Sequence, residues 1–229
     1  MKKSILSIVS AFIVIINCAS QTPINQELKK ELAQILFTDQ IYRELHDPRI
    51  TDVRRLEIAR LTNHTPEDLQ KNLYFIMKDT DSANLARVEK IVEQYGYPGK
   101  TLVGEPENIA VFYVIQHAPD KIPQYYPLIE EAAKKGELPF RLTAMMLDRM
   151  LADEGKEQIY GTQIYSRRIT NKETGKEENF MYVVPIKDPQ NVNQRRKEAG
   201  FDTTVEENAK DFGMDYKVYS YEELKKILE

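Results

Sequence analysis

Two pairs of polar residues stand where the surrounding pattern predicts apolar side chains. Asp39 and Arg43 are four residues apart, so they can pair on one face of a helix, and that face continues an apolar stripe. Gln116 and His117 end a run of apolar residues. His117 is the clearest candidate for a general acid or base, because imidazole changes charge near neutral pH.

A third polar group follows later in the chain. Asp148 and Arg149 interrupt an otherwise apolar helical pattern that Gly155 ends. A short segment with hydrogen-bonding side chains at strand spacing comes next, and its phenol, Tyr160, is suited to donating to a developing negative charge. The polar residues of this segment are Gln158, Tyr160, Thr162 and Gln163.

Arginines accompany these groups and suggest an anionic ligand. Arg43 and Arg149, with Arg195 or Arg196, could hold a carboxylate or a phosphate through paired N–H donors.

Two interpretations remain open. In the first, the three groups converge in an enzyme site, where His117 exchanges protons and Asp39 or Asp148 orients it. In the second, the same residues form a buried hydrogen-bonded network in a non-catalytic ligand-binding or interaction domain. Geometry separates the two: an enzyme needs His117 beside a carboxylate, lining a cleft with room for a substrate.

Several other mechanisms lack their motifs. The histidines His46, His64 and His117 lie in no HExxH or similar spacing, so no metal site is predicted. No GxSxG elbow, phosphate-binding loop or GxGxxG is present, and no cofactor is predicted. No spacing singles out a glycosidase carboxylate pair.

The first twenty residues differ from the rest and resemble an export signal. Lys2 and Lys3 precede an apolar run over residues 5–16, which is too short to span a bilayer. Cleavage is expected after Ser20; alternatively Cys18 is the acylated first residue of a lipoprotein, although the bulky Asn17 departs from the usual motif. Residues 1–20 are therefore predicted to be an export signal, either removed by cleavage or replaced by a lipid anchor on Cys18. Either form places the protein in the periplasm, outside the cell or on the envelope.

Composition and charge limit the classes of protein to which the chain can belong. The chain has 229 residues, enough for one domain over 21–229, and a net charge of −4. Removing Lys2 and Lys3 takes this charge to −6. An acidic protein is a poor nucleic-acid binder, and the only cysteine, Cys18, lies in the leader, which excludes disulfides from the mature chain.

The elements that must position these groups are mostly helices. The segment 109–118 is apolar all round and is predicted to be a buried helix begun near Glu107, with a buried strand as the alternative. Capping residues separate the other predicted helices, which cover 26–45, 52–62, 66–77, 81–95, 120–136, 139–153, 192–199, 205–212 and 221–228.

One β-hairpin is predicted over about residues 157–186. Its strands are 158–165 and 179–186, and the polar turn between them spans 171–178. The predicted fold is therefore α+β and mainly α-helical, a single helical domain with one C-terminal β-hairpin packed against it.

The polar residues also carry a family resemblance. YGYP at 95–98, QHA at 116–118, DR at 148–149 and QIYGTQ at 158–163 occur in that order, after Asp39-Gln40-x-x-Arg43. The chain from about Asp39 to Phe201 thereby resembles a bacterial family of unknown function, DUF6624, with Tyr97 where tryptophan is usual. The resemblance implies no established activity, but it groups Gln40 with the candidate ligand-binding residues.

Overall fold

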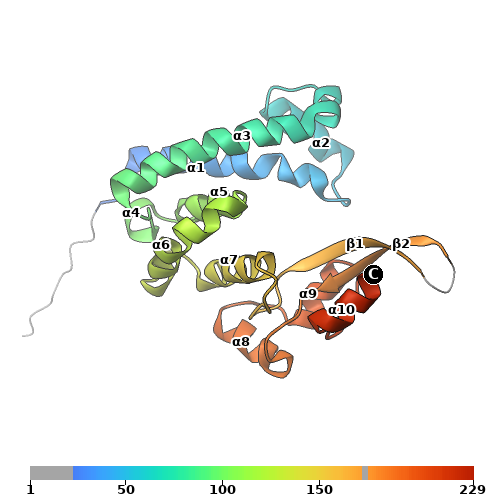
Figure 1. The fold of residues 1–229 in the computed structure, drawn as a ribbon. Helices are drawn as coiled ribbons and strands as arrows, with labels where there is room; N and C mark the ends of the chain where they lie inside the picture. Colours follow the sequence, from blue (N-terminus) through green and yellow to red (C-terminus); the bar gives the residue numbers. More distant parts are fainter. Residues whose placement is uncertain (1–22, 172–174) are drawn as a thin grey trace, which may run out of the picture.

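The computed structural model describes residues 23–171 and 175–229, which fold into helices and one antiparallel hairpin (Figure 1). The α-helices are α1 (Gln26–Ile41), α2 (Asp52–Leu61), α3 (Pro66–Tyr95), α4 (Lys100–Val103), α5 (Ala110–Gln116), α6 (Ile122–Lys134), α7 (Phe140–Asp153), α8 (Val192–Glu198), α9 (Val205–Asp211) and α10 (Tyr221–Leu228). Short 3-10 helices are η1 (Arg43–His46), η2 (Glu107–Ile109), η3 (Pro119–Lys121) and η4 (Pro189–Asn191).

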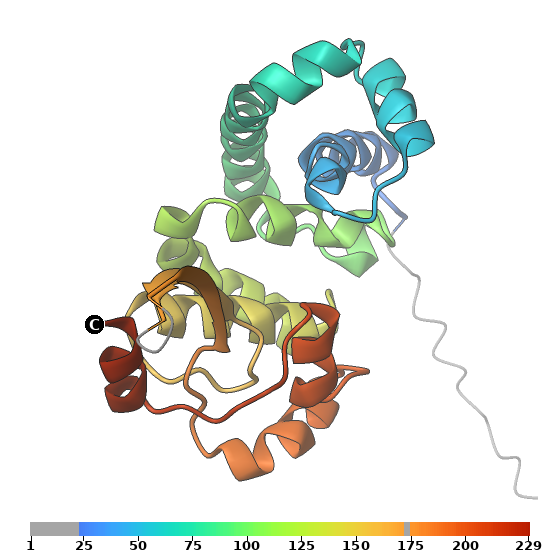
Figure 2. The ribbon, with the colours of Figure 1, turned by 90° about the vertical axis from the view of Figure 1, so that its right-hand side faces the viewer.

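The N-terminal half is a layer of helices around α5. Helices α1 and α3 run side by side, both contact α5, and α2 and the first part of α3 curve around the end of α1 (Figures 1 and 2). Phe112 and Ile115 of α5 are fully buried against Leu32 and Ile35 of α1. The helix predicted over 109–118 is thus confirmed in shortened form, and the strand alternative is wrong.

Helix α3 corrects the prediction of two helices over 66–77 and 81–95. It is one continuous helix, begun by Thr65, whose side chain accepts from the Asp68 amide, and ended by Gly96. The residues between the two predicted helices look like caps, but Thr80 and Ser82 donate their hydroxyls to carbonyls one turn earlier, those of Ile76 and Lys78. Such back-bonding satisfies these side chains inside a helix.

The C-terminal half carries the hairpin. Strands β1 (Ile164–Thr170) and β2 (Glu177–Val183) pair antiparallel, with Ile164 opposite Val183 and Tyr165 opposite Tyr182. Helices α8, α9 and α10 lie with the hairpin beside α7 (Figure 1). The first predicted strand, 158–165, is mostly wrong: residues 158–163 form a loop that touches the sheet region through one isolated bridge, Gln158 to Ile186.

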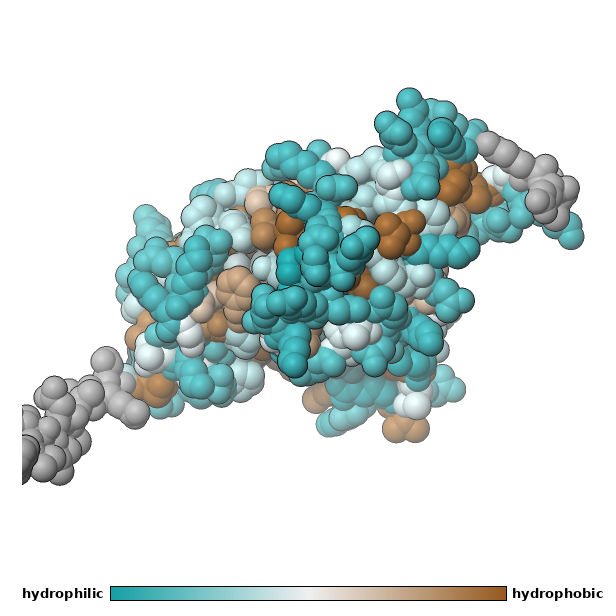
Figure 3. Space-filling view, turned by 90° about the horizontal axis from the view of Figure 1, so that it is seen from below, coloured by the Kyte–Doolittle hydropathy of each residue, from teal (hydrophilic) through white to brown (hydrophobic). Residues whose placement is uncertain are grey.

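These observations confirm the mainly helical α+β class with a C-terminal hairpin. The face seen from below is largely hydrophilic, with apolar side chains in separate small groups (Figure 3). In the described part of the chain, no helix is both long enough and apolar enough to cross a membrane. The predicted leader, residues 1–20, lies outside the described residues.

Candidate active site

A buried carboxylate and an imidazole form the centre of the candidate site. Asp39, near the end of α1, is fully buried, whereas the His117 side chain, just after α5, keeps 23% of its surface exposed. The Nδ1 atom of His117 lies 3.1 Å from Oδ1 and 3.0 Å from Oδ2 of Asp39. The prediction that these two sequence-distant groups meet is therefore confirmed.

Further side chains hold the Asp39 carboxylate in place. Gln40 donates its amide to Asp39 Oδ2 at 2.6 Å. Arg43 donates to the Asp39 carbonyl, and its Nη1 lies 3.7 Å from Asp39 Oδ1. The other end of the same guanidinium donates to both oxygens of Asp81 at 2.9 Å. Arg43 therefore bridges two aspartates through its two terminal nitrogens.

This geometry fixes the proton on the imidazole. A carboxylate can only accept, so the Nδ1 of His117 carries the hydrogen and the Nε2 keeps its lone pair. The ring also stacks on Tyr113, one turn earlier, with centroids 6.3 Å apart and planes at 23°. A carboxylate that orients a histidine while its other nitrogen remains available is the arrangement of a general base.

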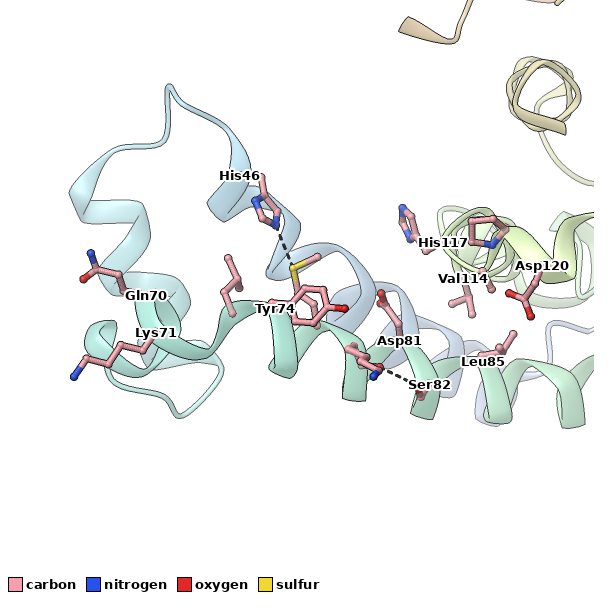
Figure 4. A pocket seen from close by; sticks show the side chains of 15 residues that line it. His46, Gln70, Lys71, Tyr74, Asp81, Ser82, Leu85, Val114, His117 and Asp120 are labelled. Atoms are coloured by element: carbon pink, nitrogen blue, oxygen red, sulfur yellow. Dashed lines mark hydrogen bonds between the residues drawn. The ribbon is translucent and has the colours of Figure 1, made fainter. Parts of the chain in front are cut away.

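The imidazole faces a groove. The cavity has a volume of about 680 Å³, within the usual range for small-molecule sites. Figure 4 shows the groove residues of α3 running from Gln70 to Leu85, with His46 above them and His117 and Asp120 at the far end. Its lining is mixed: apolar side chains alternate with Lys71, Lys78, Asp81, Asp120 and His46.

The sequence did not single out the groove residues of α3 and η1. Asp81 and His46, neither of which is among the predicted site residues, both line the groove, and His46 Nε2 lies 3.3 Å from Met77 Sδ. Lining residues of α3 recur every three or four positions from Gln70 through Leu73, Met77 and Asp81. That periodicity was visible, but only an unbroken α3 puts them on one face.

The third predicted group is built differently. Asp148 on α7 is fully buried, and its carboxylate accepts from the backbone amides of Ile159, Tyr160 and Thr162 at 2.7–3.1 Å. The Thr162 hydroxyl donates to the same carboxylate at 3.0 Å. Burial raises the pKa of Asp148, against the lowering effect of these hydrogen bonds. Asp148 is thus occupied by the loop and does not orient His117.

The loop over 158–163 is closed by its own residues. Gln158 is fully buried, donates to the carbonyls of Gln163 and Val184, and accepts from the Gln163 amide at 2.8 Å. The Gln163 side chain donates to the Thr162 hydroxyl at 3.1 Å. Gly161 has a φ of 70°, and a Cβ there would lie 2.8 Å from Ile186 and Val205 side chains.

Two arginines of α8 hold the loop from its other side. Arg195 donates to the Ile159 carbonyl at 3.0 Å, and the buried Arg196 donates to the Tyr160 carbonyl at 2.9 Å. Arg196 also donates to Thr203 and lies over the Phe201 ring, 4.6 Å from its centroid. Burial lowers the pKa of Arg196. Its contacts assign it to holding the loop rather than to binding a ligand.

The remaining predicted residues lie outside the groove. The Tyr160 ring lies 6.1 Å from Phe201, and burial raises its pKa, so its phenol stays neutral. The Oε1 of Gln116 and the Nε of Arg149 are buried and have no partner within the described residues. Neither residue lines the groove beside His117.

Two of the three predicted groups therefore converge. Within the described residues, no hydrogen bond or ion pair joins the Asp39–His117 pair to Asp148 or its loop. The part of the chain that the structure describes also holds no cluster of three side chains suited to binding a metal ion. What remains is a proton-transfer pair at a groove, together with a separate buried network.

Fold and site define a mainly helical α+β protein with a carboxylate-oriented histidine at an open groove. The model of a family of unknown function, DUF6624, matches residues 50–218, and the chain belongs to that family. No curated protein and no solved structure matches the chain.

Proposed function

We propose that the protein is a hydrolase or transferase of the bacterial envelope, in which His117 acts as the acid–base residue. The observation that carries this proposal is the buried Asp39 carboxylate on His117 Nδ1, beside a groove large enough for a small molecule. His117 also lines that groove and keeps 23% of its side-chain surface exposed.

The reaction proceeds by general-base catalysis. Nε2 of His117 takes a proton from water, or from an acceptor hydroxyl in a transferase, as that oxygen bonds to the electrophilic carbon or phosphorus. The bond to the leaving oxygen then breaks, and the imidazolium returns its proton to that oxygen. Asp39 stabilises the positive ring between the two steps without taking the proton itself.

Covalent catalysis by a side-chain hydroxyl has no support in the groove. Ser82 lines it, but its hydroxyl donates to the Lys78 carbonyl at 2.8 Å. His117 has no hydrogen bond to a serine or threonine within the described residues. The nucleophile is therefore the bound water or the second substrate.

Lysines, rather than the predicted arginines, support an anionic small molecule or cell-wall fragment as substrate. Arg43 is taken by Asp81 and Asp39, whereas Lys71 and Lys78 line the groove and form no ion pair within the described residues. They supply positive charge in a protein that is otherwise acidic.

The envelope location is supported by the sequence alone. Lys2, Lys3 and the apolar run over 5–16, followed by small residues, have the order of an export signal. Mass spectrometry of the mature N-terminus tests it. A start at Gln21 indicates cleavage, a lipid on Cys18 indicates anchoring, and an intact Met1 contradicts export.

Activity should be tested with panels of chromogenic esters and phosphoesters of small anionic alcohols. His117→Gln should lower kcat/KM by about 10²- to 10⁴-fold on any substrate that the wild-type protein turns over. The matched control is His64→Gln, since His64 contacts the Tyr42 ring and lies outside the groove. Equal activity of His117→Gln and the wild type would contradict the proposal.

A non-catalytic binding or interaction domain is the second candidate. The observation that favours it is the Asp148 network. There, polar residues of the motifs that carry the family resemblance hold a loop in place. A domain of this kind would bind a ligand in the groove with no turnover, and His117→Gln would change affinity alone.

A further inference from the structure

The groove at His117 does not end at the first cavity. A second cavity of about 520 Å³ is lined by residues of η1, α2 and the start of α3, and it shares Gln70 and Leu73 with the first. Lining positions therefore continue along α3 from Pro66 to Leu85. At 1.5 Å per residue, this stretch of helix is about 28 Å long.

Apolar side chains recur along this path between the polar and charged ones. Leu45, Leu73 and Met77 are only partly buried, although they pack on the small core cluster formed by buried residues at the end of α1, in α2 and in α3. Met77 is unbranched and fits ligands of varied shape. The further apolar lining residues are Pro66, Leu69, Tyr74, Leu85, Val114, Ala118 and Pro119.

Charge is distributed unevenly along the same path. Lys71 and Lys78 lie two helical turns apart on the groove side of α3, and neither is paired within the described residues. Asp81 is neutralised by Arg43 close to His117. The site thus combines recurring apolar side chains, three cations without an ion pair in the described residues (Lys71, Lys78 and, in the second cavity, Arg55) and a proton-transfer residue at one end.

We infer that the substrate is an elongated anionic amphiphile, an ester with a linear acyl chain. Its chain lies along α3 between the two cavities, its ester lies at His117, and its negative group lies near Lys78 or Lys71. The inference rests on the proposed function for the place of the reacting bond, but chain binding does not depend on turnover. A compact polar ligand would leave the second cavity and its apolar wall unused.

The reaction at this site is ester hydrolysis. Water bonds to the acyl carbon while His117 takes its proton; the carbon–oxygen bond to the alcohol then breaks, and the imidazolium protonates the leaving alcohol. The products are a carboxylic acid and an alcohol.

Calorimetric titration of the mature protein with sodium hexanoate, octanoate, decanoate and dodecanoate, below their micellar concentrations, tests chain binding. Affinity should rise with chain length, by up to about fourfold for each methylene that becomes fully buried. An affinity that does not change with chain length overturns the inference, as expected if the groove takes a peptide or a compact polar ligand.

Two neighbouring aromatic residues give a matched pair of variants. Tyr74 lines the groove and Phe75 does not, yet both are exposed on α3 and contact each other, so neither replacement should unfold the protein. Tyr74→Ala should weaken dodecanoate binding at least threefold, and Phe75→Ala should leave it unchanged. Equal effects would place the chain elsewhere and overturn the inference.

Charge is tested by comparing an acid with an alcohol. Lys78→Gln should weaken the binding of dodecanoate severalfold and leave the binding of 1-dodecanol unchanged. Equal effects on both ligands would show that the groove does not recognise a negative group. Turnover separates the two proposals. If binding depends on chain length but acyl esters are not hydrolysed, only the proposed function is contradicted. If short esters are hydrolysed but binding does not depend on chain length, only the inference of an amphiphilic substrate is contradicted.

Discussion

Asp39 and Asp148 are both fully buried aspartates on helices, and their partners give them opposite properties. Asp148 accepts from backbone amides and one hydroxyl, all in a single loop. Asp39 accepts from side chains, one of which is the partly exposed His117 at a groove. A carboxylate held by backbone groups fixes a loop, whereas one held by side chains can pass its charge to a reacting group.

The largest expected effect in this comparison is on stability and belongs to Asp148. Asp148→Asn replaces one acceptor oxygen with an NH₂ group that faces amide donors, so the free energy of unfolding should fall by about 3–5 kcal/mol. Urea denaturation measures it. The control is Asp153→Asn on the same helix, where the exposed bond from the Tyr165 hydroxyl should be worth less than about 1 kcal/mol. Equal losses would contradict a structural role for the Asp148 loop.

Gly161 tests whether that loop is rigid. Alanine at this position would meet Ile186 and Val205 at 2.8 Å with a φ of 70°, so Gly161→Ala should cost about 3 kcal/mol. Gly155→Ala is matched, since Gly155 has a φ of 68° but open space around it, and should cost only about 1 kcal/mol. Thermal unfolding of both variants gives the difference. If the two variants melt together, the loop moves aside and its close packing is not maintained in solution.

Replacing Asp39 should affect stability less than replacing Asp148, but should change the protonation of His117. Asp39→Asn should cost about 1–2 kcal/mol, because Gln40, Arg43 and His117 are side chains that can reorient. The proton on His117 should become evenly shared between its nitrogens, which ¹⁵N NMR of the imidazole detects. A Gln40→Ala variant, which keeps the carboxylate, should retain the Nδ1–H form. Unchanged imidazole shifts in Asp39→Asn would show that Asp39 does not set the tautomer.

The comparison also explains what the sequence could predict. Asp39 and His117 stood out because each is polar on an otherwise apolar face, and two such groups lower their desolvation cost by meeting. Most helices followed from periodicity and caps, as at the Ser220–Glu223 capping box of α10, although the break predicted between residues 77 and 81 lies inside α3. These signals are local, and the structure confirms the other predicted helices that depend on them.

What could not be predicted depends on backbone groups and long-range contacts. Apart from the Thr162 hydroxyl, the partners of Asp148 are the backbone amides of Ile159, Tyr160 and Thr162, which have no signature in side-chain types. The same amides explain why 158–163 is a loop, although its alternating polar residues favoured a strand. Asp81 was missed because capping residue types occur both at a helix start and, through back-bonding, inside a helix.

The smallest expected effect is a difference in pKa between an exposed and a buried carboxylate, both of which accept hydrogen bonds from backbone amides. At the exposed Glu223, the Ser220 amide and hydroxyl lower the pKa below 4.5; at Asp148, burial raises the pKa above 3.8 despite more donors. Carboxyl ¹³C NMR titration should find these opposite directions. The contribution of Glu223 to stability is therefore present above pH 4.5 and is lost as the pH falls through its folded pKa. The contribution of Asp148 is greatest below pH 3.8 and is lost as the pH rises through its folded pKa. An Asp148 pKa below 3.8 would show that the loop amides outweigh burial, and that this carboxylate stabilises the loop most strongly in its charged form.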